Sequence, residues 1–319
     1  MKSEQANYFL HPASLCDSSD IGANTTISAF TRIHAGSRIG QDCKISESVL
    51  IEDDVVLGDR VTIKNGVQLW SGTLVADDAY IGPNATFSQE PAGATSSAAA
   101  SATTTVRQHA FVGANATIHA GITLGENSVV TAGAVVERSV PPFAIVSGNP
   151  AKIVGYANAR SSDVSVNATR SAEPGVVNTR VKGVTLHTFK AVTDLRGSLS
   201  VGEFPGDIPF EPKRYFLVYD VPTADTRGEH AHHRCHQFLI AVKGSISVVV
   251  DDGRVREEVT LDKPELGLYL PPMTWGIQYK YSSDAVLLVF ASDLYDATDY
   301  IRDYSEFSRL TASNTSSCA

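Results

Sequence analysis

The sequence predicts an all-β protein with two halves of different construction. Through residues 9–136 an aliphatic or aromatic residue returns at every sixth position, a spacing that matches neither the α-helical period nor a simple hairpin. From residue 184 onward, short apolar strands alternate with turn signals. We therefore expect a parallel β-helix of hexapeptide repeats, followed by an antiparallel sandwich or jelly-roll domain.

The hexapeptide repeat is regular enough to define its architecture. Residue types agree between repeats, as in IGANTT, LGDRVT, IGPNAT and VGANAT, where glycine follows the aliphatic residue. In such a solenoid each coil has three short strands, and the repeated side chains stack inward. A β-sandwich would not keep one spacing over so many strands. The repeated positions are Phe9, Leu15, Ile21, Ile27, Ile33, Ile39, Ile45, Ile51, Leu57, Ile63, Leu69, Val75, Ile81, Phe87, Val106, Val112, Ile118, Leu124, Val130 and Val136.

The repeat is interrupted between Phe87 and Val106, and this interval of nineteen residues is not a multiple of six. The intervening sequence, SQEPAGATSSAAASATTT, is low in complexity. We expect a loop to leave the β-helix here. Such a loop is either a flexible segment or the border of a binding cleft, and the sequence favours neither interpretation.

The second half reads as about eight antiparallel strands with no helix between them, which suggests a sandwich or jelly roll, the cupin architecture among them. Asp251-Asp252-Gly253 is a strong hairpin signal, and the acidic, aromatic tail at residues 293–310 is expected to form a terminal helix. The expected strands are VTLHTF, GSLSVGEF, RYFLVYDV, HQFLIAVKG, SISVVVDDG, REEVTL, LGLYLPP and AVLLVFAS. The expected parts are a β-helix domain at 9–156, a linker at 157–180 and a cupin domain at 181–311.

Composition excludes some classes of partner. The formal net charge is -9, and no run of Lys and Arg is present that could neutralise a phosphate backbone, so we expect no nucleic-acid binding. A single nucleotide ligand needs only a few arginines and stays possible. The N-terminal MKSEQANYFLHPAS lacks the apolar core of a signal peptide, and no stretch is long and apolar enough to span a membrane. We expect a cytoplasmic protein without a membrane partner.

The stretch RGEHAHHRCHQFLI, residues 227–240, holds four of the nine histidines. In a regular strand His230 and His232 share one face, with Arg234 and His236 following on it, while His233 and Cys235 fall on the other face. A solvated edge strand or a set of structural histidines would explain the cluster without chemistry. The functional alternatives are a metal site and a general acid/base pair.

The metal alternative lacks two of its usual ligands. Metal-binding cupins place a carboxylate about five residues after the His-x-His pair, where this chain has Gln237, and a further histidine after a Pro-containing strand, where it has Gly276. A three-histidine site that uses His236 stays open. Without a metal, adjacent imidazoles in an apolar barrel act as proton carriers, and their natural reaction is proton abstraction beside a carbonyl. We expect no metal in the cupin.

The end of the repeat, VERSVPPFAIVSGNPAKIVGY, together with the hexads resembles the left-handed β-helix acyltransferases. The longer stretch that begins at TTTVRQHAF is similar to the N-acetyltransferases of nucleotide-linked 3-amino-3,6-dideoxyhexoses. The resemblance implies acetyl-CoA as co-substrate, a trimer with active sites between subunits, and a place beside the acyl-CoA site for Asn149 and Lys152. His119 and His34, which both lie in IHAG hexads, and His109, which flanks the interruption, are the candidate bases. A solvated histidine on the outer face of the solenoid is the alternative for each.

One segment departs from that family. Its members usually have Thr/Ser-Asn-Asp followed by an aromatic residue, Pro and Arg after the position of Phe87, whereas this chain has Ser88-Gln89-Glu90 and no arginine. The alternative is therefore a β-helix that serves only as an oligomerising scaffold.

The second half resembles the sugar-nucleotide 3,4-ketoisomerases, metal-independent cupins that act on dTDP-4-keto-6-deoxy-D-glucose. The motifs that carry the resemblance are DLRGSL, KRYFLVYDVP, RGEHAHHRCHQFLIAVKGSISVVVDDG, LGLYLPPMTW and DYIRDY. The resemblance implies an enediol mechanism in which His232 is the base at C3 and His230 is its partner at C4. Residues expected to line the pyrophosphate and sugar pocket are Arg214, Tyr219, Arg227 and Arg234.

Together the two resemblances imply a bifunctional enzyme of surface-polysaccharide deoxysugar biosynthesis. The isomerase would make a 3-keto sugar, a separate aminotransferase would place an amine at C3, and the β-helix would acetylate that amine. The alternatives are a ketoisomerase with a non-catalytic β-helix, and a metal-dependent cupin oxygenase or sugar-binding protein. A trimeric β-helix joined to a dimeric cupin would permit a homo-hexamer.

Overall fold

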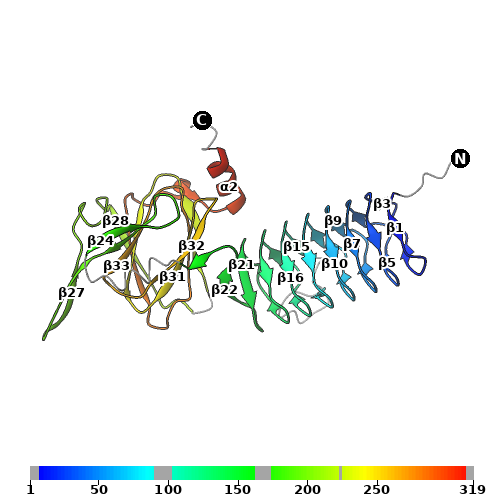
Figure 1. Cartoon of the computed structure of the whole chain (residues 1–319), viewed down its shortest axis with the longest axis horizontal. Coiled ribbons are helices and arrows are strands. Elements are labelled where there is room, and N and C mark those ends of the chain that lie inside the picture. Colours follow the sequence, from blue (N-terminus) through cyan, green and yellow to red (C-terminus); the bar gives the residue numbers. More distant parts are fainter. Residues whose placement is uncertain (1–6, 90–102, 162–173, 223–224, 314–319) are drawn as a thin grey trace. The chain divides into compact units, whose positions relative to one another are not determined.

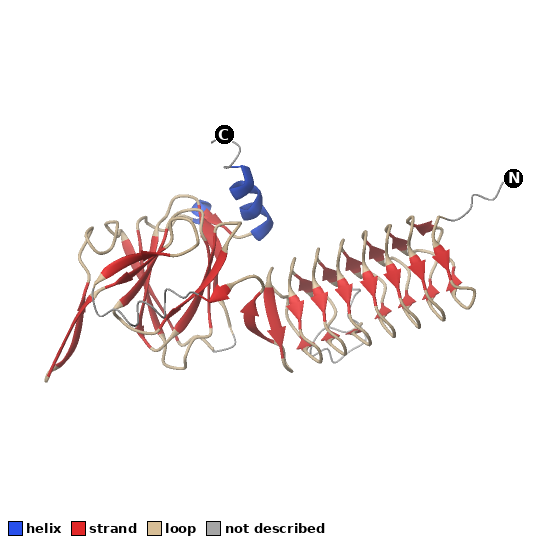
Figure 2. Cartoon of the chain, in the orientation of Figure 1, coloured by secondary structure: helices blue, strands red, loops and turns tan. Residues whose placement is uncertain are grey.

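The computed structural model describes residues 7–89, 103–161, 174–222 and 225–313. The chain divides into two compact units, Met1–Ala157 and Asn158–Ala319. Figure 2 shows that nearly all the regular structure of both units is strand. The predicted fold class is confirmed: a parallel β-helix is followed by an antiparallel β-barrel of the jelly-roll type.

The first unit is a β-helix built from three parallel sheets, seen as successive coils in Figure 1. One sheet contains β1 (Phe9–Leu10), β4 (Thr26–Ile27), β7 (Lys44–Ile45), β10 (Thr62–Ile63), β13 (Tyr80–Ile81), β16 (Phe111–Val112), β19 (Val129–Val130), β21 (Ala144–Ser147) and β22 (Lys152–Tyr156). The second contains β2 (Leu15–Cys16), β5 (Arg32–Ile33), β8 (Leu50–Ile51), β11 (Gln68–Leu69), β14 (Thr86–Phe87), β17 (Thr117–Ile118) and β20 (Val135–Val136). The third contains β3 (Asp20–Ile21), β6 (Arg38–Ile39), β9 (Val56–Leu57), β12 (Leu74–Val75), β15 (Thr105–Val106) and β18 (Thr123–Leu124).

The six-residue period arises because each side of a coil needs inward side chains and one tight corner. The repeated aliphatic residue and the residue two positions before it are both buried, as Ile63 and Val61 are. Ile27, Ile45 and Ile63 stack directly on one another in register and are at most 1% exposed. The corners require a left-handed backbone, which Asn, Asp and Gly adopt more readily than other residues. Asn24 and Asp42 have φ of 59° and 57° at equivalent corners. The repeat thus reflects two requirements: the inward residues must pack in the core, and the corner residue must adopt a left-handed backbone.

The β-helix continues across the predicted interruption. β12 pairs with β15 through Leu74 and Thr105, so the sheet resumes as though no residues had been inserted. Ser88 still donates its N–H to Ile118 O on the next coil. The low-complexity segment at 90–102, including Glu90, lies outside the described residues, so both interpretations of it, a flexible loop and the border of a cleft, stay open.

The β-helix ends in a hairpin formed by β21 and β22. Gly148, at φ 98°, begins the turn, and the turn is fixed to β20 because Ala151 donates its N–H to Val135 O. Asn149 and Lys152 are exposed in this turn. The sequence predicted the position of the turn; its role beside an acyl-CoA site stays a prediction.

The second unit consists of two six-stranded sheets and a separate two-stranded hairpin. One sheet has the order β23 (Arg160–Ser161), β32 (Arg256–Leu261), β31 (Ile246–Asp251), β34 (Trp275–Tyr279), β29 (Arg227–His232), β36 (Tyr300–Ile301). The other has the order β24 (Gly175–Asn178), β25 (Thr185–Thr188), β33 (Leu266–Leu270), β30 (Gln237–Lys243), β35 (Val286–Ala291), β28 (Arg214–Tyr219). β26 (Lys190–Asp194) pairs only with β27 (Gly197–Val201) among the described strands.

The core of this unit lies between the two large sheets. Leu239 and Leu268 from one sheet belong to the same buried cluster as Val248 and Val259 from the other. Alternate residues of β30 point outward, where Phe238 packs in a smaller apolar cluster. Burial on both faces explains why β30 reads as a continuous apolar run rather than as an alternating pattern.

Two predictions about the second unit need correction. The expected helix over 293–310 is only partly helical: α2 covers Tyr304–Ser313, and the residues before it form the 3-10 turn η1 (Ala297–Asp299) and strand β36. The range expected to be a linker, 157–180, contains β23 and β24, which pair with β32 and β25. Residues whose polar composition suggested a linker or a helix therefore form strands, because they pair with other strands of the second unit.

In the part of the chain that the structure describes, no helix is long and apolar enough to cross a bilayer.

Candidate functional site

The histidine-rich stretch is divided between two strands: residues 227–232 form β29, between β34 and β36, and residues 237–240 begin β30 in the other sheet. Strand β29 is irregular, because a bulge at Glu229 shifts its register against β34. Gly228 at φ 82° and Glu229 at φ 53° form the bulge, and a Cβ on Gly228 would lie 2.5 Å from Gly276 O. Glycine is therefore required at this point. Beyond the bulge His230 and His232 lie on one face, with ring centroids 4.9 Å apart at an interplanar angle of 83°.

His232 is held by a buried carboxylate that the sequence did not identify. Its Nδ1 lies 2.9 Å from Asp299 Oδ2, and both side chains are 5% exposed. The same carboxylate accepts N–H groups from Arg234 at 2.8 Å and Cys235 at 3.2 Å. Because a carboxylate accepts hydrogen bonds, Nδ1 of His232 carries the proton and Nε2 is the basic nitrogen. The Gln237 amide, 3.1 Å from Nε2, orients that nitrogen further.

His230 is fixed in the same tautomer by a different acceptor. Its Nδ1 lies 2.8 Å from the carbonyl oxygen of Gly228, which can only accept, so its Nε2 is also basic. Burial lowers the pKa of His230 to about 4, and the nearby positive charge of Arg302 acts in the same direction. Burial also lowers the pKa of His232, although Asp299 opposes that effect. The site therefore presents two neutral imidazole bases at pH 7.

An aromatic and cationic wall adjoins the two imidazoles. The Tyr300 ring centroid lies 4.3 Å from that of His232 and 4.9 Å from that of His230, and Arg302 stacks on Tyr300 at 4.4 Å. Arg214 lies over Tyr295 at 5.5 Å, and its buried Nε has no hydrogen-bond partner among the residues that the structure describes. An unsatisfied buried guanidinium nitrogen is suited to an anionic ligand.

The other predicted pocket residues lie in different surroundings. Arg234 is exposed and forms an ion pair with Asp296 at 3.0 Å, because β29 ends at His232 and the chain bends away. Arg227 is also exposed and lies opposite Gln278. Tyr219 is exposed on the face of β28 opposite that of Arg214, since the two are five residues apart in a regular strand. Of the four predicted pocket residues, Arg214 is the one whose charge affects the pKa of His232.

Two expectations from strand parity are wrong for the same reason. His236 does not continue the face of His232; its Nδ1 lies 2.6 Å from Tyr269 OH, and the two rings stack. Cys235, expected on the far face, lines the same small pocket as His230 and His232. The bend after His232 interrupts the two-residue period on which both expectations relied.

Two positions at which metal-binding cupins carry ligands hold Gln237 and Gly276 in this chain. Gly276 pairs directly with His230, and the described side chains that line the pocket beside it, Thr274 and Gln278, offer a hydroxyl and an amide rather than an imidazole or a carboxylate. Among the described residues, one group of metal-type ligands is present: His232, Cys235 and Asp299, whose ligand atoms all lie within 4.8 Å of one another. A metal there would have to replace the proton of the His232–Asp299 hydrogen bond. A cupin without a metal stays a prediction.

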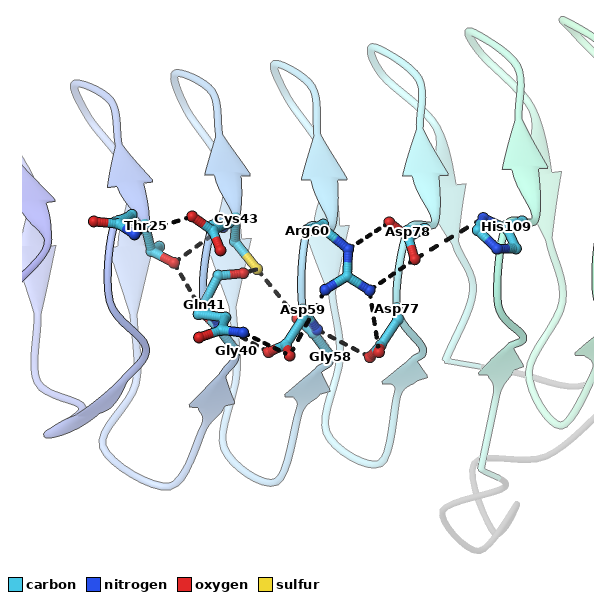
Figure 3. Close-up of polar contacts among 12 residues, drawn as sticks. Thr25, Gly40, Gln41, Cys43, Gly58, Asp59, Arg60, Asp77, Asp78 and His109 are labelled. Atoms are coloured by element: carbon cyan, nitrogen blue, oxygen red, sulfur yellow. Dashed lines mark hydrogen bonds and ion pairs between the residues drawn. The ribbon is translucent and has the colours of Figure 1, made fainter.

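The candidate residues of the β-helix lie at two different corners. Figure 3 shows His109 one coil beyond Asp78, which receives two hydrogen bonds from Arg60 at 2.7 and 2.8 Å. His109 Nδ1 is 4.0 Å from Asp78 Oδ2. His119 follows β17, at the corner from which the segment after Phe87 departs, and the next residues hold that segment's end because Gly121 donates to Thr104 Oγ1 at 3.1 Å. The structure therefore brings His119, rather than His109, to the base of the inserted segment.

His34 occupies the equivalent corner of an earlier coil, after β5. Its Nδ1 is 3.4 Å from Asp53 Oδ2, and the two side chains are 34% and 56% exposed. Its pairing resembles that of His232 in chemistry but not in burial.

Comparison with known proteins gives both halves relatives. The family model described as WxcM-like, C-terminal (FdtA) matches residues 182–312, and a model for the hexapeptide repeat of succinyl-transferase matches residues 104–138. The TDP-4-oxo-6-deoxy-alpha-D-glucose-3,4-oxoisomerase of Aneurinibacillus thermoaerophilus is 44% identical over 124 residues, which are 39% of this chain and 89% of that relative.

A second relative comes from the same organism. Its dTDP-3-amino-3,6-dideoxy-alpha-D-galactopyranose 3-N-acetyltransferase is 49% identical over 53 residues, which are 17% of this chain and 28% of that relative. This chain therefore matches little more than a quarter of the length of that acetyltransferase. Among solved structures, a 3,4-ketoisomerase from Helicobacter canadensis is 40% identical with a TM-score of 0.40, over 41% of this chain and 98% of that chain.

Proposed function

The chain belongs to the FdtA family through its second unit, and from that premise we propose that residues 181–311 are a 3,4-ketoisomerase acting on dTDP-4-keto-6-deoxy-D-glucose. The observation that carries the proposal is the pair of buried imidazoles, each with Nδ1 committed to an acceptor and Nε2 basic. Two neutral bases 4.9 Å apart suit the transfer of protons between adjacent carbons.

The proposed reaction moves two protons and no other atoms. His232 Nε2 takes the proton from C3, the electron pair forms the C3=C4 bond, and the C4 oxygen receives that proton to give an enediol. His230 Nε2 takes the proton of the O3 hydroxyl and delivers it to C4, while the electron pair on O3 forms the new carbonyl. Asp299 stabilises the imidazolium that forms on His232. The face from which His230 protonates C4 sets the epimer of the product.

Binding of the nucleotide is assigned to the cationic wall. Arg214 has a buried, unsatisfied Nε, and Arg302 lies close enough to both imidazoles for its charge to lower their pKa values. A pyrophosphate would satisfy such guanidinium groups with charge-assisted hydrogen bonds. Tyr295 and Tyr300, whose rings are 5.7 Å apart, offer apolar faces to the sugar or the base.

The β-helix unit is proposed to transfer an acetyl group from acetyl-CoA to the amine of a dTDP-3-amino-3,6-dideoxyhexose. The support is the hexapeptide repeat and the position of His119 at the base of the inserted segment. His119 would accept the proton that the amine loses as it attacks the thioester, and Asn149 and Lys152 would lie beside the CoA. Ser88 and Gln89, which depart from the usual acetyltransferase segment, support the alternative of a scaffold.

Oligomerisation is part of the proposal. The edge strand β28 presents Tyr215, Leu217 and Tyr219 outward, all exposed, and the β26–β27 hairpin has an exposed Leu199. A two-stranded hairpin alone is marginally stable, and an apolar edge strand invites pairing, so a dimer of cupin units would cover both. With a trimeric β-helix this gives a hexamer.

The isomerase is tested by NMR of dTDP-4-keto-6-deoxyglucose incubated with the chain. We expect a 3-keto product whose C4 configuration identifies the epimer. Recovery of unchanged substrate with a folded chain would contradict the proposal.

The acetyltransferase is tested by following CoA release from acetyl-CoA with a dTDP-3-amino-3,6-dideoxyhexose as acceptor. We expect release that depends on the amino sugar. A chain that isomerises but never releases CoA would establish the scaffold alternative for the β-helix.

A further inference from the structure

The second unit contains a cavity apart from the catalytic pocket. Its volume is about 330 Å³, within the range of small-molecule sites. The wall comes from four separate segments: the turn before β25, the β31–β32 turn, the loop between β33 and β34, and helix α2. The lining residues are Lys182, Gly183, Asp252, Arg254, Pro271, Pro272, Met273 and Thr311.

The charge of this cavity favours an anion. Asp252 is engaged by backbone groups: Oδ2 accepts the N–H of Lys182 at 3.0 Å, and Oδ1 accepts those of Arg254 and Val255 at 2.9 Å. The side chains of Lys182 and Arg254 form no ion pair with any residue that the structure describes. The cavity therefore has a positive character. It contains two cations without an ion-pair partner among the described residues, and its one carboxylate already accepts hydrogen bonds from backbone donors.

The cavity is a built feature of the fold. Gly183 at φ 76°, Gly253 at φ 87° and Met273 at φ 59° all hold a left-handed backbone in its wall. A Cβ on Gly253 would lie 2.3 Å from Thr311 Oγ1, and one on Gly183 would lie 3.1 Å from Pro271 Cγ. Glycine thus lets two pairs of segments approach closely, Gly183 the β33–β34 loop and Gly253 helix α2, while Pro271, Pro272 and Met273 leave an apolar side to the space.

The cavity shares a wall with the catalytic site. Pro271 lines both spaces, and Thr274, three residues further on, lines the catalytic pocket. Met273 donates its N–H to the carbonyl oxygen of His232 at 2.7 Å. A ligand that presses on this loop therefore acts on the backbone that positions the proposed base and on one side of the catalytic pocket.

We propose that this cavity binds a small phosphorylated metabolite with an apolar group, and that its occupancy inhibits the isomerase. The phosphate would lie between Lys182 and Arg254, and the apolar group against Pro272 and Met273. Outward pressure on Pro271 would narrow the catalytic pocket and raise KM for the sugar nucleotide. The inhibitory half of the proposal rests on the proposed ketoisomerase function; the binding half does not.

The test uses phenyl phosphate as probe on the full-length chain, with inorganic phosphate and phenol as its separate parts. Trp275 lies two residues beyond Met273, and the chain has only one other tryptophan, Trp70. In a Trp70→Phe background, the fluorescence of Trp275 therefore reports binding. We expect saturable binding of phenyl phosphate, about tenfold or more tighter than that of inorganic phosphate, and none of phenol.

Three variants locate the site. The double substitution Lys182→Gln/Arg254→Gln is expected to weaken binding about tenfold or more, because it removes both charge-assisted contacts. The charge-matched control Lys243→Gln/Arg309→Gln, whose residues do not line the cavity, is expected to bind like the parent. Arg214→Gln, in the proposed catalytic pocket, should also retain binding. The proposal would be overturned if Arg214→Gln lost binding while Lys182→Gln/Arg254→Gln kept it.

Inhibition is measured as KM for proton exchange into the sugar nucleotide in D2O. We expect phenyl phosphate to raise KM about fivefold or more in the parent and the Lys243→Gln/Arg309→Gln control, and to leave it unchanged in Lys182→Gln/Arg254→Gln. An unchanged KM in the parent at saturating probe would contradict the inhibitory half. Absence of exchange in every variant, with the binding pattern intact, would instead contradict the ketoisomerase and support the cavity as a binding site.

Discussion

His232 of the cupin unit and His34 of the β-helix unit both pair with a carboxylate, but in different environments. His232 and Asp299 are both 5% exposed, whereas the side chains of His34 and Asp53 are 34% and 56% exposed. Burial lowers the pKa of His232, and Asp299 fixes which nitrogen is basic. A His–carboxylate pair becomes a defined base where the fold itself excludes water. For the proposed acetyl transfer, substrate or a neighbouring subunit would have to exclude water from the β-helix histidines.

The variant expected to have the greatest effect is His232→Asn, which tests whether the buried imidazole is the base. Removing the base that takes the C3 proton should lower the isomerisation rate about 10³-fold or more. The matched control is His233→Asn, because His233 is adjacent but exposed. Both rates are measured by NMR of the sugar nucleotide. Equal losses in the two variants would show that burial does not distinguish the base.

Asp299→Asn tests the buried partner. The carboxylate raises the pKa of His232 against the effect of burial, so its loss lets that pKa fall further below 6.5. We expect kcat to fall about 10²-fold, because the base is weaker and its tautomer is no longer fixed. The acid limb of the pH–rate profile should move to lower pH.

The control for that variant is Asp296→Asn, whose carboxylate is exposed and caps η1. It should leave the position of the acid limb unchanged. A shift of the limb to higher pH in Asp299→Asn would contradict the assigned role.

His119→Asn applies the same test to the β-helix. We expect acetyl transfer to fall about tenfold to hundredfold, less than for His232, because a solvent-accessible amine can also lose its proton to water. His34→Asn is the control, since His34 occupies the equivalent corner away from the inserted segment. CoA release at saturating acetyl-CoA measures both. If His34→Asn lowered acetyl transfer more than His119→Asn did, the site would lie on the earlier coil, and the assignment of His119 would be wrong.

The smallest expected effect concerns stability. In the cupin unit Tyr304 OH lies 2.7 Å from Asp251 Oδ2 and 3.0 Å from an Arg256 nitrogen, and all three residues are buried. Tyr304→Phe should lower the free energy of unfolding by about 1–2 kcal/mol, because it leaves buried charged groups short of a hydrogen bond. Urea unfolding followed by Trp275, whose ring contacts Tyr304 at 5.2 Å, reports the loss.

The matching substitution in the β-helix is Asp78→Asn, which removes the negative charge and one of the two oxygens that accept hydrogen bonds from Arg60. Exposed ion pairs are screened by water, so the unfolding midpoint reported by Trp70 should stay within experimental error. If Asp78→Asn shifted the unfolding midpoint strongly and Tyr304→Phe did not, the exposed contact would stabilise the protein more than the buried one, contrary to our expectation.

The β-helix was predictable because its period depends on neighbouring coils alone. Ile27, Ile45 and Ile63 recur where identical corners recur, so the sequence shows the packing directly. The proximity of His230 and His232, the proposed catalytic pair, was equally predictable, since the two residues share one strand.

Asp299 and Tyr300 were not predictable, because they lie in a tail whose composition favours helix. They reach the site because β36 pairs with β29, a contact between residues nearly seventy positions apart: Ala231 with Ile301 and His232 with Tyr300. Likewise the bend after His232 has no local signal, which is why Arg234 and His236 were placed on the wrong face. Sequence periodicity does not reveal strand pairing between distant residues, and that pairing overrides the local secondary-structure preference of a segment.

The most direct test of the central claim, that imidazoles and not a metal move the protons, is exchange in D2O after exhaustive chelation. We expect the chelated wild-type chain to incorporate deuterium at C3 of recovered substrate and at C4 of the 3-keto product, at the rate of the untreated chain. Loss of exchange on chelation with recovery on added metal would contradict the account and identify His232, Cys235 and Asp299 as metal ligands.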